Sequence, residues 1–200
     1  MILNLSVVNL HVVNSMRVAA IAVMSLLIMV VANNYVLAQE YVATHKWSGK
    51  GLRLELAPLS LDLVRAFFIG RDFSAADADY IAKAGCIFRS AIGNSGKTNS
   101  DPKISIQLKK WRIIQADQHK PPMTREDWAD VWKKRGVDQS PAIAFHWALY
   151  PTEQQYSPTD YNWGLISFAM PPGTKFDLEV TWLMSGKRQQ KLLKNLECGK

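Results

Sequence analysis

Residues 175–198 read KFDLEVTWLMSGKRQQKLLKNLEC and carry the clearest secondary-structure pattern of the 200-residue chain. Large apolar side chains occupy every second position at its start: Phe176, Leu178, Val180 and Trp182. Alternation with a period of two is typical of a strand that buries one face. Ser185-Gly186-Lys187 then has the composition of a hairpin turn, and a second strand follows up to Cys198. The stretch therefore predicts a long antiparallel β-hairpin.

Other stretches of the chain have strand-like patterns and are separated by turn residues. Leucine alternates with charged residues over 52–56, and large apolar residues alternate with Ala and His over 142–149. The further expected strands are residues 61–70, 86–92, 103–114 and 163–170. About seven strands with mostly short connections predict a mainly β fold, an antiparallel β-sandwich of the immunoglobulin-like kind with two short helical insertions. An α+β sheet with both helices on one face is the alternative.

Two segments carry the capping signals of the two expected helices. Ser74 precedes AADADYIAKA, with Asp77 at the third helical position and Gly85 at the end. Thr124 precedes REDWADVWKKR, which is acidic in its first turn and basic in its last. That order of charges complements the helix dipole.

Composition and charge bound the class of protein. The chain is 48% hydrophobic and 20% charged, which excludes a disordered, collagen-like or coiled-coil protein. Its 24 Lys and Arg against 17 Asp and Glu give a net charge of +7. Basic residues gather at 109–112, 133–135 and 187–194. We expect these clusters to face solvent or to meet an anionic partner of the cell envelope, not a nucleic acid.

The N-terminus has the pattern of an export signal. Residues 1–38 contain one basic residue, Arg17, and no acidic residue, and residues 18–32 form an apolar run. Val36 and Ala38 fit the −3 and −1 positions of a cleavage site. We therefore expect a signal peptide over 1–38, with translation starting at Met1 or Met16. A single β-rich domain over 39–200 would then be periplasmic or secreted. The alternative is an uncleaved segment that anchors the protein in the inner membrane, which would be its sole membrane contact.

The two cysteines fit that location. Cys86 and Cys198 are an even pair in a compartment that oxidises thiols. Their disulfide would close a loop of about 110 residues and tie the C-terminus to the core.

The chain shows no pattern typical of an enzyme. Residues 91–98, AIGNSGKT, match a loose phosphate-loop pattern. A real phosphate loop needs a helix that starts at its lysine, and here Lys97-Thr98 is followed by NSDP and a strand, so we interpret the segment as a turn. There is also no G-x-S-x-G sequence, so we expect a protein that is not an enzyme and has no cofactor.

A metal site is the alternative function. His119 and Met123 lie four residues apart in the loop HKPPM, and His45 is a third candidate ligand. Imidazole and thioether together suit copper. This set favours a periplasmic copper carrier as the second hypothesis.

The segment YPTEQQYSPTDYNW, residues 150–163, predicts the functional surface. Its candidate partner-binding residues are Tyr150, Tyr156, Asp160, Tyr161 and Trp163. Amphipathic aromatic rings beside hydrogen-bonding groups suit a glycan or a protein partner. The leading hypothesis is therefore an exported, non-enzymatic binding or accessory protein of the bacterial cell envelope. It would engage a protein or a glycan through this aromatic loop and through its basic strands.

Overall fold

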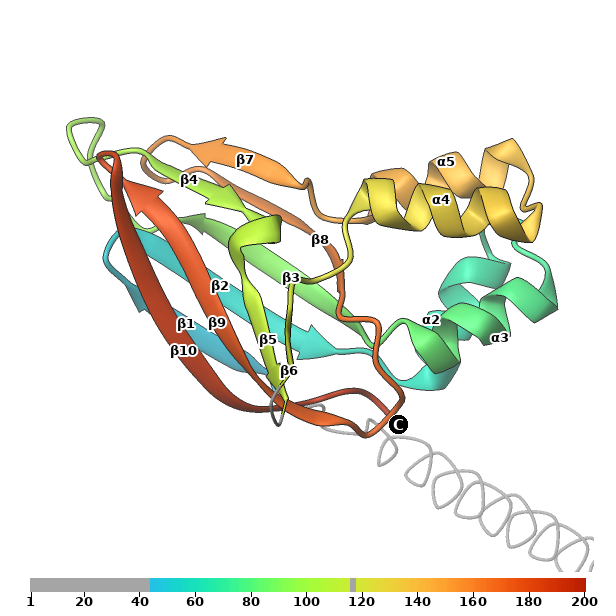
Figure 1. Ribbon diagram of the computed structural model, residues 1–200. Coiled ribbons are helices and arrows are strands. Elements are labelled where there is room, and N and C mark those ends of the chain that lie inside the picture. Colours follow the sequence, from blue (N-terminus) through green and yellow to red (C-terminus); the bar gives the residue numbers. More distant parts are fainter. Residues whose placement is uncertain (1–43, 116–117) are drawn as a thin grey trace, which may run out of the picture. The chain divides into compact units, whose positions relative to one another are not determined.

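The C-terminal hairpin is present as predicted. In the computed structural model, which describes residues 44–115 and 118–200, β9 (Lys175–Met184) pairs antiparallel with β10 (Lys187–Glu197) (Figure 1). Ser185 and Gly186 join the two strands with φ angles of 52° and 74°. Two successive positive φ angles define the tight turn whose twist matches that of the flanking strands.

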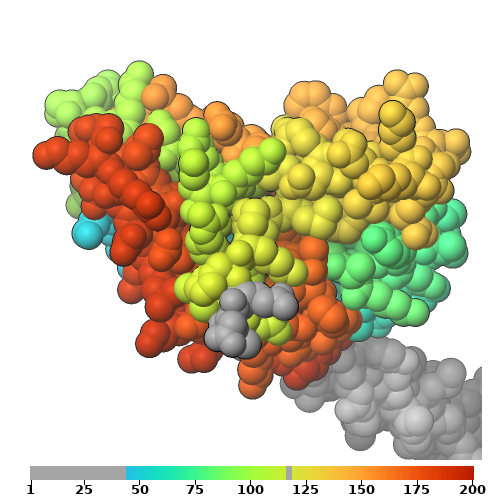
Figure 2. Space-filling model, in the orientation of Figure 1, coloured from blue at the N-terminus to red at the C-terminus, as the bar shows by residue number. Residues whose placement is uncertain are grey.

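The hairpin belongs to the larger of two antiparallel sheets. Residues 104–115 run along the other edge of β9 in two pieces, β4 (Ile104–Gln107) and β5 (Arg112–Gln115). A short 3-10 turn, η1 (Leu108–Lys110), separates them. β7 (Glu153–Tyr156) pairs with β4, and β6 (Gln118–Lys120) pairs with β5. Figure 2 shows the face on which the red C-terminal strands adjoin the yellow-green segment that holds β4 and β5.

The second sheet has four strands in the order β1-β2-β3-β8. They are β1 (His45–Gly49), β2 (Leu52–Pro58), β3 (Ile87–Asn94) and β8 (Tyr161–Ser167), and all are antiparallel. The burial of β2 alternates strictly over Leu52, Leu54 and Leu56, as its sequence predicts. A mainly β fold with two antiparallel sheets is therefore confirmed.

One apolar cluster receives side chains from both sheets. Leu54, Phe88 and Ile166 come from the four-stranded sheet, and Leu178 and Trp182 come from the larger one. The indole N–H of Trp182 donates to the carbonyl of Lys50, 2.9 Å away, so a core side chain also fixes the turn between β1 and β2. This shared cluster holds the two sheets together.

The disulfide between Cys86 and Cys198 is confirmed. Their Cα atoms lie 5.2 Å apart, and both side chains are buried in the shared cluster. Disulfides persist in oxidising compartments, so this bond indicates a protein that functions outside the cytoplasm. Within residues 44–115 and 118–200, no helix is long and apolar enough to cross a membrane. The predicted signal peptide, residues 1–38, lies outside the described residues.

The described part contains four α-helices, not two. α3 (Ala75–Ala84) and α4 (Arg125–Arg135) are the helices that Ser74 and Thr124 predict. α2 (Leu61–Ile69) and α5 (Gln139–Ala148) replace the strands expected over 61–70 and 142–149. All four lie together at one end of the strands (Figure 1).

The two corrections have the same physical origin. In α2, Val64 and Phe68 are buried at a spacing of four, and the Ser60 hydroxyl accepts the N–H of Leu63 as an N-cap. Phe145 of α5 and Leu149, the residue that caps its end, are buried, whereas Ile143 is exposed. An apparent period of two over 143–149 is thus a period of four, split between an inner and an outer helix face. Small residues between the large ones made the two periods hard to distinguish.

Aromatic rings form the core of the helical part. Trp128 and Trp132 of α4 stack with ring centroids 5.1 Å apart, and Phe145 of α5 lies 5.4 and 5.2 Å from them. The indole N–H groups of both tryptophans are buried without an acceptor in the described part of the chain.

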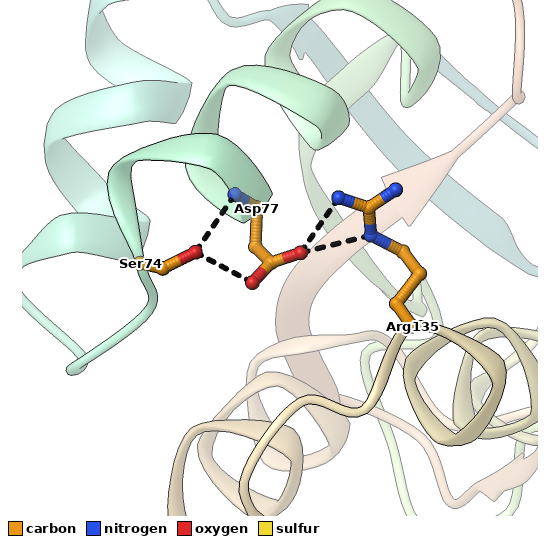
Figure 3. A network of polar contacts seen from close by, with 3 residues as sticks. All are labelled: Ser74, Asp77 and Arg135. Atoms are coloured by element: carbon orange, nitrogen blue, oxygen red, sulfur yellow. Dashed lines mark hydrogen bonds and ion pairs between the residues drawn. The ribbon is translucent and has the colours of Figure 1, made fainter.

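A polar network joins the two helix pairs (Figure 3). The Ser74 hydroxyl accepts the backbone N–H of Asp77 at the start of α3 and donates to the Asp77 carboxylate, 2.6 Å away. Arg135, the last residue of α4, binds the other oxygen of the Asp77 carboxylate at 2.7 and 2.8 Å. The Ser74 hydrogen bond, together with Arg135, lowers the pKa of Asp77 below its usual range.

Candidate ligand-binding face

The four-stranded sheet presents two exposed aromatic rings on the face turned away from the shared cluster. Tyr161 and Trp163 lie two residues apart on β8, and 63% and 73% of their surface is exposed. Side chains two residues apart in a strand point to the same side, about 6.6 Å apart. The two rings therefore lie on the same side of β8.

Small residues lie beside these rings. In the strand register, Tyr161 pairs with Gly93 and Trp163 pairs with Ala91. A side-chain carbon on Gly93 would lie 2.5 Å from the Asp160 carbonyl oxygen and 2.6 Å from the Tyr161 Cβ atom. Only glycine lets β8 approach β3 this closely. Ala91 and Gly93 therefore add little side-chain volume next to Tyr161 and Trp163.

Charged side chains stand on the next strand. Arg53 of β2 pairs with Gly93, and its guanidinium lies 5.9 Å from the Tyr161 ring centroid. Glu55 pairs with Ala91, and its carboxylate lies 3.3 Å from the ammonium of Lys46 on β1. Arg53 can reach the tyrosine because Gly93 puts no side chain between them.

A small cavity of about 150 Å³ lies on the same face. Trp163 forms one wall, and Glu55, Arg89 and Ala91 contribute the others. We call the surface formed by Arg53, Glu55, Arg89, Ala91, Gly93, Tyr161 and Trp163 the aromatic face. It combines flat apolar rings with hydrogen-bonding groups of both charges, which suits a ligand with alternating C–H and hydroxyl groups.

Asp160, also expected to bind a partner, is exposed and holds the turn before Tyr161. Its carboxylate accepts the backbone N–H of Ser157 at 3.0 Å, and its carbonyl accepts the N–H of Asn94 at 2.9 Å. These bonds fix the turn that leads into β8. Asp160 therefore sets the position of Tyr161.

Tyr150 and Tyr156, also expected to bind a partner, are buried core residues. Their hydroxyl groups form a hydrogen bond with each other. Burial raises the pKa of the Tyr156 phenol to about 12 and raises that of Tyr150 as well. Of the aromatic residues expected to bind a partner, Tyr161 and Trp163 are therefore the exposed ones.

The expected copper ligands lie on three different elements. His119 is exposed on β6, and Met123 packs against the helical part while its N–H donates to the Ser167 carbonyl. His45 is half-buried on β1, where partial burial lowers its pKa. Across 44–115 and 118–200, no three His, Cys, Asp or Glu residues gather where they could hold a metal ion.

Two of the basic clusters meet on the larger sheet. Lys110 and Arg112 line a cavity of about 280 Å³ together with Arg188 of β10. The carboxylate of Glu179 lies 3.5 Å from Arg188. The third cluster, residues 133–135, ends α4, where Arg135 binds Asp77.

Residues 91–94 are the end of β3, and the expected turn is found over 95–98 only. The backbone N–H groups of Lys97 and Thr98 donate to the Asp101 carboxylate at 2.7 and 2.9 Å. No helix begins at this lysine.

Sequence reasoning missed Arg53, Arg89, Ala91 and Gly93. Strand alternation places each of them on one side of its own strand. Their neighbours become visible only when the register with β8 is known. Comparisons with protein-family models, with curated proteins and with solved structures gave no match.

Proposed function

We propose that this chain is an exported, non-enzymatic binding protein of the bacterial cell envelope, and that it binds a glycan through Tyr161 and Trp163. The observation that carries the proposal is the exposure of both rings on one sheet face, beside the small residues Ala91 and Gly93. Exposed aromatic rings cost free energy in water, and stacking against the C–H face of a sugar relieves that cost.

The proposal includes the location and the architecture. We propose that the two sheets, which share one apolar cluster, form an immunoglobulin-like β-sandwich. The apolar run over 18–32 and the disulfide together support export to the periplasm.

The polar groups of the aromatic face support binding over catalysis. Arg53 lies against the Tyr161 ring, and Glu55 is paired with Lys46. Side chains held in such contacts can donate to or accept from ligand hydroxyl groups without a proton transfer. The basic groups Lys110, Arg112 and Arg188 on the other sheet would attract an acidic envelope polymer from a distance.

A matched pair of tryptophans gives a sharp test. Trp147 on α5 is 72% exposed, almost equal to Trp163, but belongs to the helical part. Affinity for polysaccharide isolated from the native envelope would be measured for the wild type, for the double variant Tyr161→Ala, Trp163→Ala, and for Trp147→Ala. Stacking contributes about 0.5–1.5 kcal/mol per ring. The double variant should therefore lose about 1–3 kcal/mol of binding free energy, which is about fivefold to a hundredfold in affinity, and Trp147→Ala should bind like the wild type.

A second arm separates a glycan from a protein partner. Envelope extract is treated with protease before it is offered to the immobilised protein. Retained binding after protease, lost after digestion by glycosidases, is the expected result. Binding that disappears with protease alone, or an equal loss in both tryptophan variants, would overturn the proposal.

A further inference from the structure

Another cavity lies away from the aromatic face, between α4 and α5. Its volume is about 410 Å³, within the range of small-molecule sites. Trp132, Val137, Ile143 and Phe145 form apolar walls. Ile143 is 47% exposed, although it is a large aliphatic side chain. We call this cavity the helical groove.

The helical groove carries positive charge and no carboxylate. Arg125, Lys133 and His146 line it, and none of its lining residues is Asp or Glu. Arg125 and His146 lie at one end, because α4 begins where α5 ends and Arg125 donates from Nε to the Leu149 carbonyl at 2.9 Å. Lys133 marks the other end, eight residues or about 12 Å along α4.

Arg125 keeps unused binding capacity. Nε and Nη2 both donate to the Leu149 carbonyl, so three of the five guanidinium N–H bonds remain. In the described part of the chain Arg125 forms no salt bridge. Its guanidinium lies 5.6 Å from the Trp147 ring centroid and interacts electrostatically with the Glu126 carboxylate, which accepts a hydrogen bond from Thr152. Partial burial lowers the pKa of Arg125, which reflects the cost of removing water from its charge. A bound anion would offset that cost.

We propose that the helical groove binds a small amphiphilic carboxylate, of the fatty-acid class, with its headgroup at Arg125 and its chain along Val137, Ala142 and Ile143. The carboxylate accepts from the guanidinium donors that Leu149 leaves free. The chain covers apolar surface that water now contacts at Ile143. At about 25 cal/mol per Å² of apolar area, burial of the chain supplies most of the affinity, and the charge selects the headgroup.

The test compares two ligands that differ only in the headgroup. Decanoate and decanol are titrated into the protein, purified in the form that the cell accumulates, and binding is measured by calorimetry. Decanoate should bind at least tenfold more tightly than decanol. Arg125→Gln should remove that difference while leaving decanol binding unchanged. Lys134→Gln, a change of an exposed lysine on the same helix that does not line the groove, should bind decanoate like the wild type.

A second variant keeps the test decisive if Arg125→Gln fails to fold. Ile143→Asp changes an exposed position and should abolish the binding of both ligands. The variant Tyr161→Ala, Trp163→Ala should bind decanoate like the wild type, because the helical groove and the aromatic face are separate sites. Failure of the glycan proposal can therefore be distinguished from failure of this one. Equal affinity for decanoate and decanol, an absence of decanoate binding, or unchanged binding by both Arg125→Gln and Ile143→Asp would overturn it.

Discussion

Removal of the disulfide is the perturbation whose effect on stability follows most directly from the structure. In the double variant Cys86→Ala, Cys198→Ala, the chain loses the covalent link between the start of β3 and the end of β10. Cys86 has a φ angle of 43°, and alanine meets the same backbone strain there as cysteine does. The main change is therefore the loss of the link itself.

The magnitude comes from the length of the loop. The two residues are 112 positions apart, and the chain-entropy relation gives about 5 kcal/mol at 25 °C for a loop of this size. Strain and residual structure in the unfolded chain reduce the measured effect, and native disulfides usually contribute 2–5 kcal/mol. We therefore expect the free energy of unfolding to fall by about 3–5 kcal/mol. A typical domain has about 5–15 kcal/mol in total.

Equilibrium unfolding in urea, followed by tryptophan fluorescence, measures this loss by linear extrapolation. Wild-type protein treated with a reductant is the matched control, and it should unfold at the same urea concentration as the double variant. A decrease of less than about 1 kcal/mol, or reduced wild-type protein as stable as the oxidised form, would refute the reasoning.

Three further predictions concern the sheet and the helices. Gly93→Ala forces a side-chain carbon against the backbone before β8, so it should cost about 1–3 kcal/mol in urea unfolding and weaken glycan binding; Gly70→Ala, where the nearest atom would be 3.4 Å away, is the control that should do neither. Asp77→Asn removes a carboxylate that Ser74 and Arg135 stabilise, at a cost of about 1 kcal/mol. Folding lowers the pKa of Asp77, so the difference in free energy of unfolding between this variant and the wild type should be complete above about pH 4. It should vanish as the pH falls through the lowered pKa, and a difference that persists in strong acid would contradict this prediction. Thr124→Ala breaks the capping box of α4 and should cost about 1 kcal/mol in the same assay, and an unchanged urea midpoint would show that the cap is redundant.

Local sequence signals predicted the elements that local physics controls. The capping residues Ser74 and Thr124 placed two helices correctly, and Ser185-Gly186 placed the long hairpin. The disulfide followed from the parity of two cysteines and an export signal. The caps and the turn depend on residues that are close in sequence. The disulfide was predictable because the chain has two cysteines, which allow one pairing.

Elements whose apolar residues fit two periods were predicted wrongly. Residues 61–70 and 142–149 have large side chains at spacings that suit both a strand and a helix. Packing decided between the two, because Phe68 and Phe145 bury their rings against each other with centroids 5.0 Å apart. The Ser60 cap and Pro141 in the first turn of α5 were the local signals available for helices.

The exposed rings of the candidate site could be predicted from the sequence, but their neighbours could not, because these depend on long-range strand pairing. The sequence predicted Tyr161 and Trp163 as binding residues, but it predicted Tyr150 and Tyr156 equally, and these two are buried in the core. Whether a tyrosine is buried depends on strand register, a long-range property. The small residues that shape the aromatic face come from β3, about 70 positions away in the chain.

The most direct test of the central claim locates the ligand on the protein. Envelope glycan is titrated into protein labelled for NMR, and the indole N–H resonances of the seven tryptophans are followed, after assignment by single substitutions. If Trp163 binds the glycan, its resonance shifts as glycan is added, and the Trp147 resonance does not change. A glycan that binds while the Trp163 resonance remains unchanged would contradict glycan binding at the aromatic face.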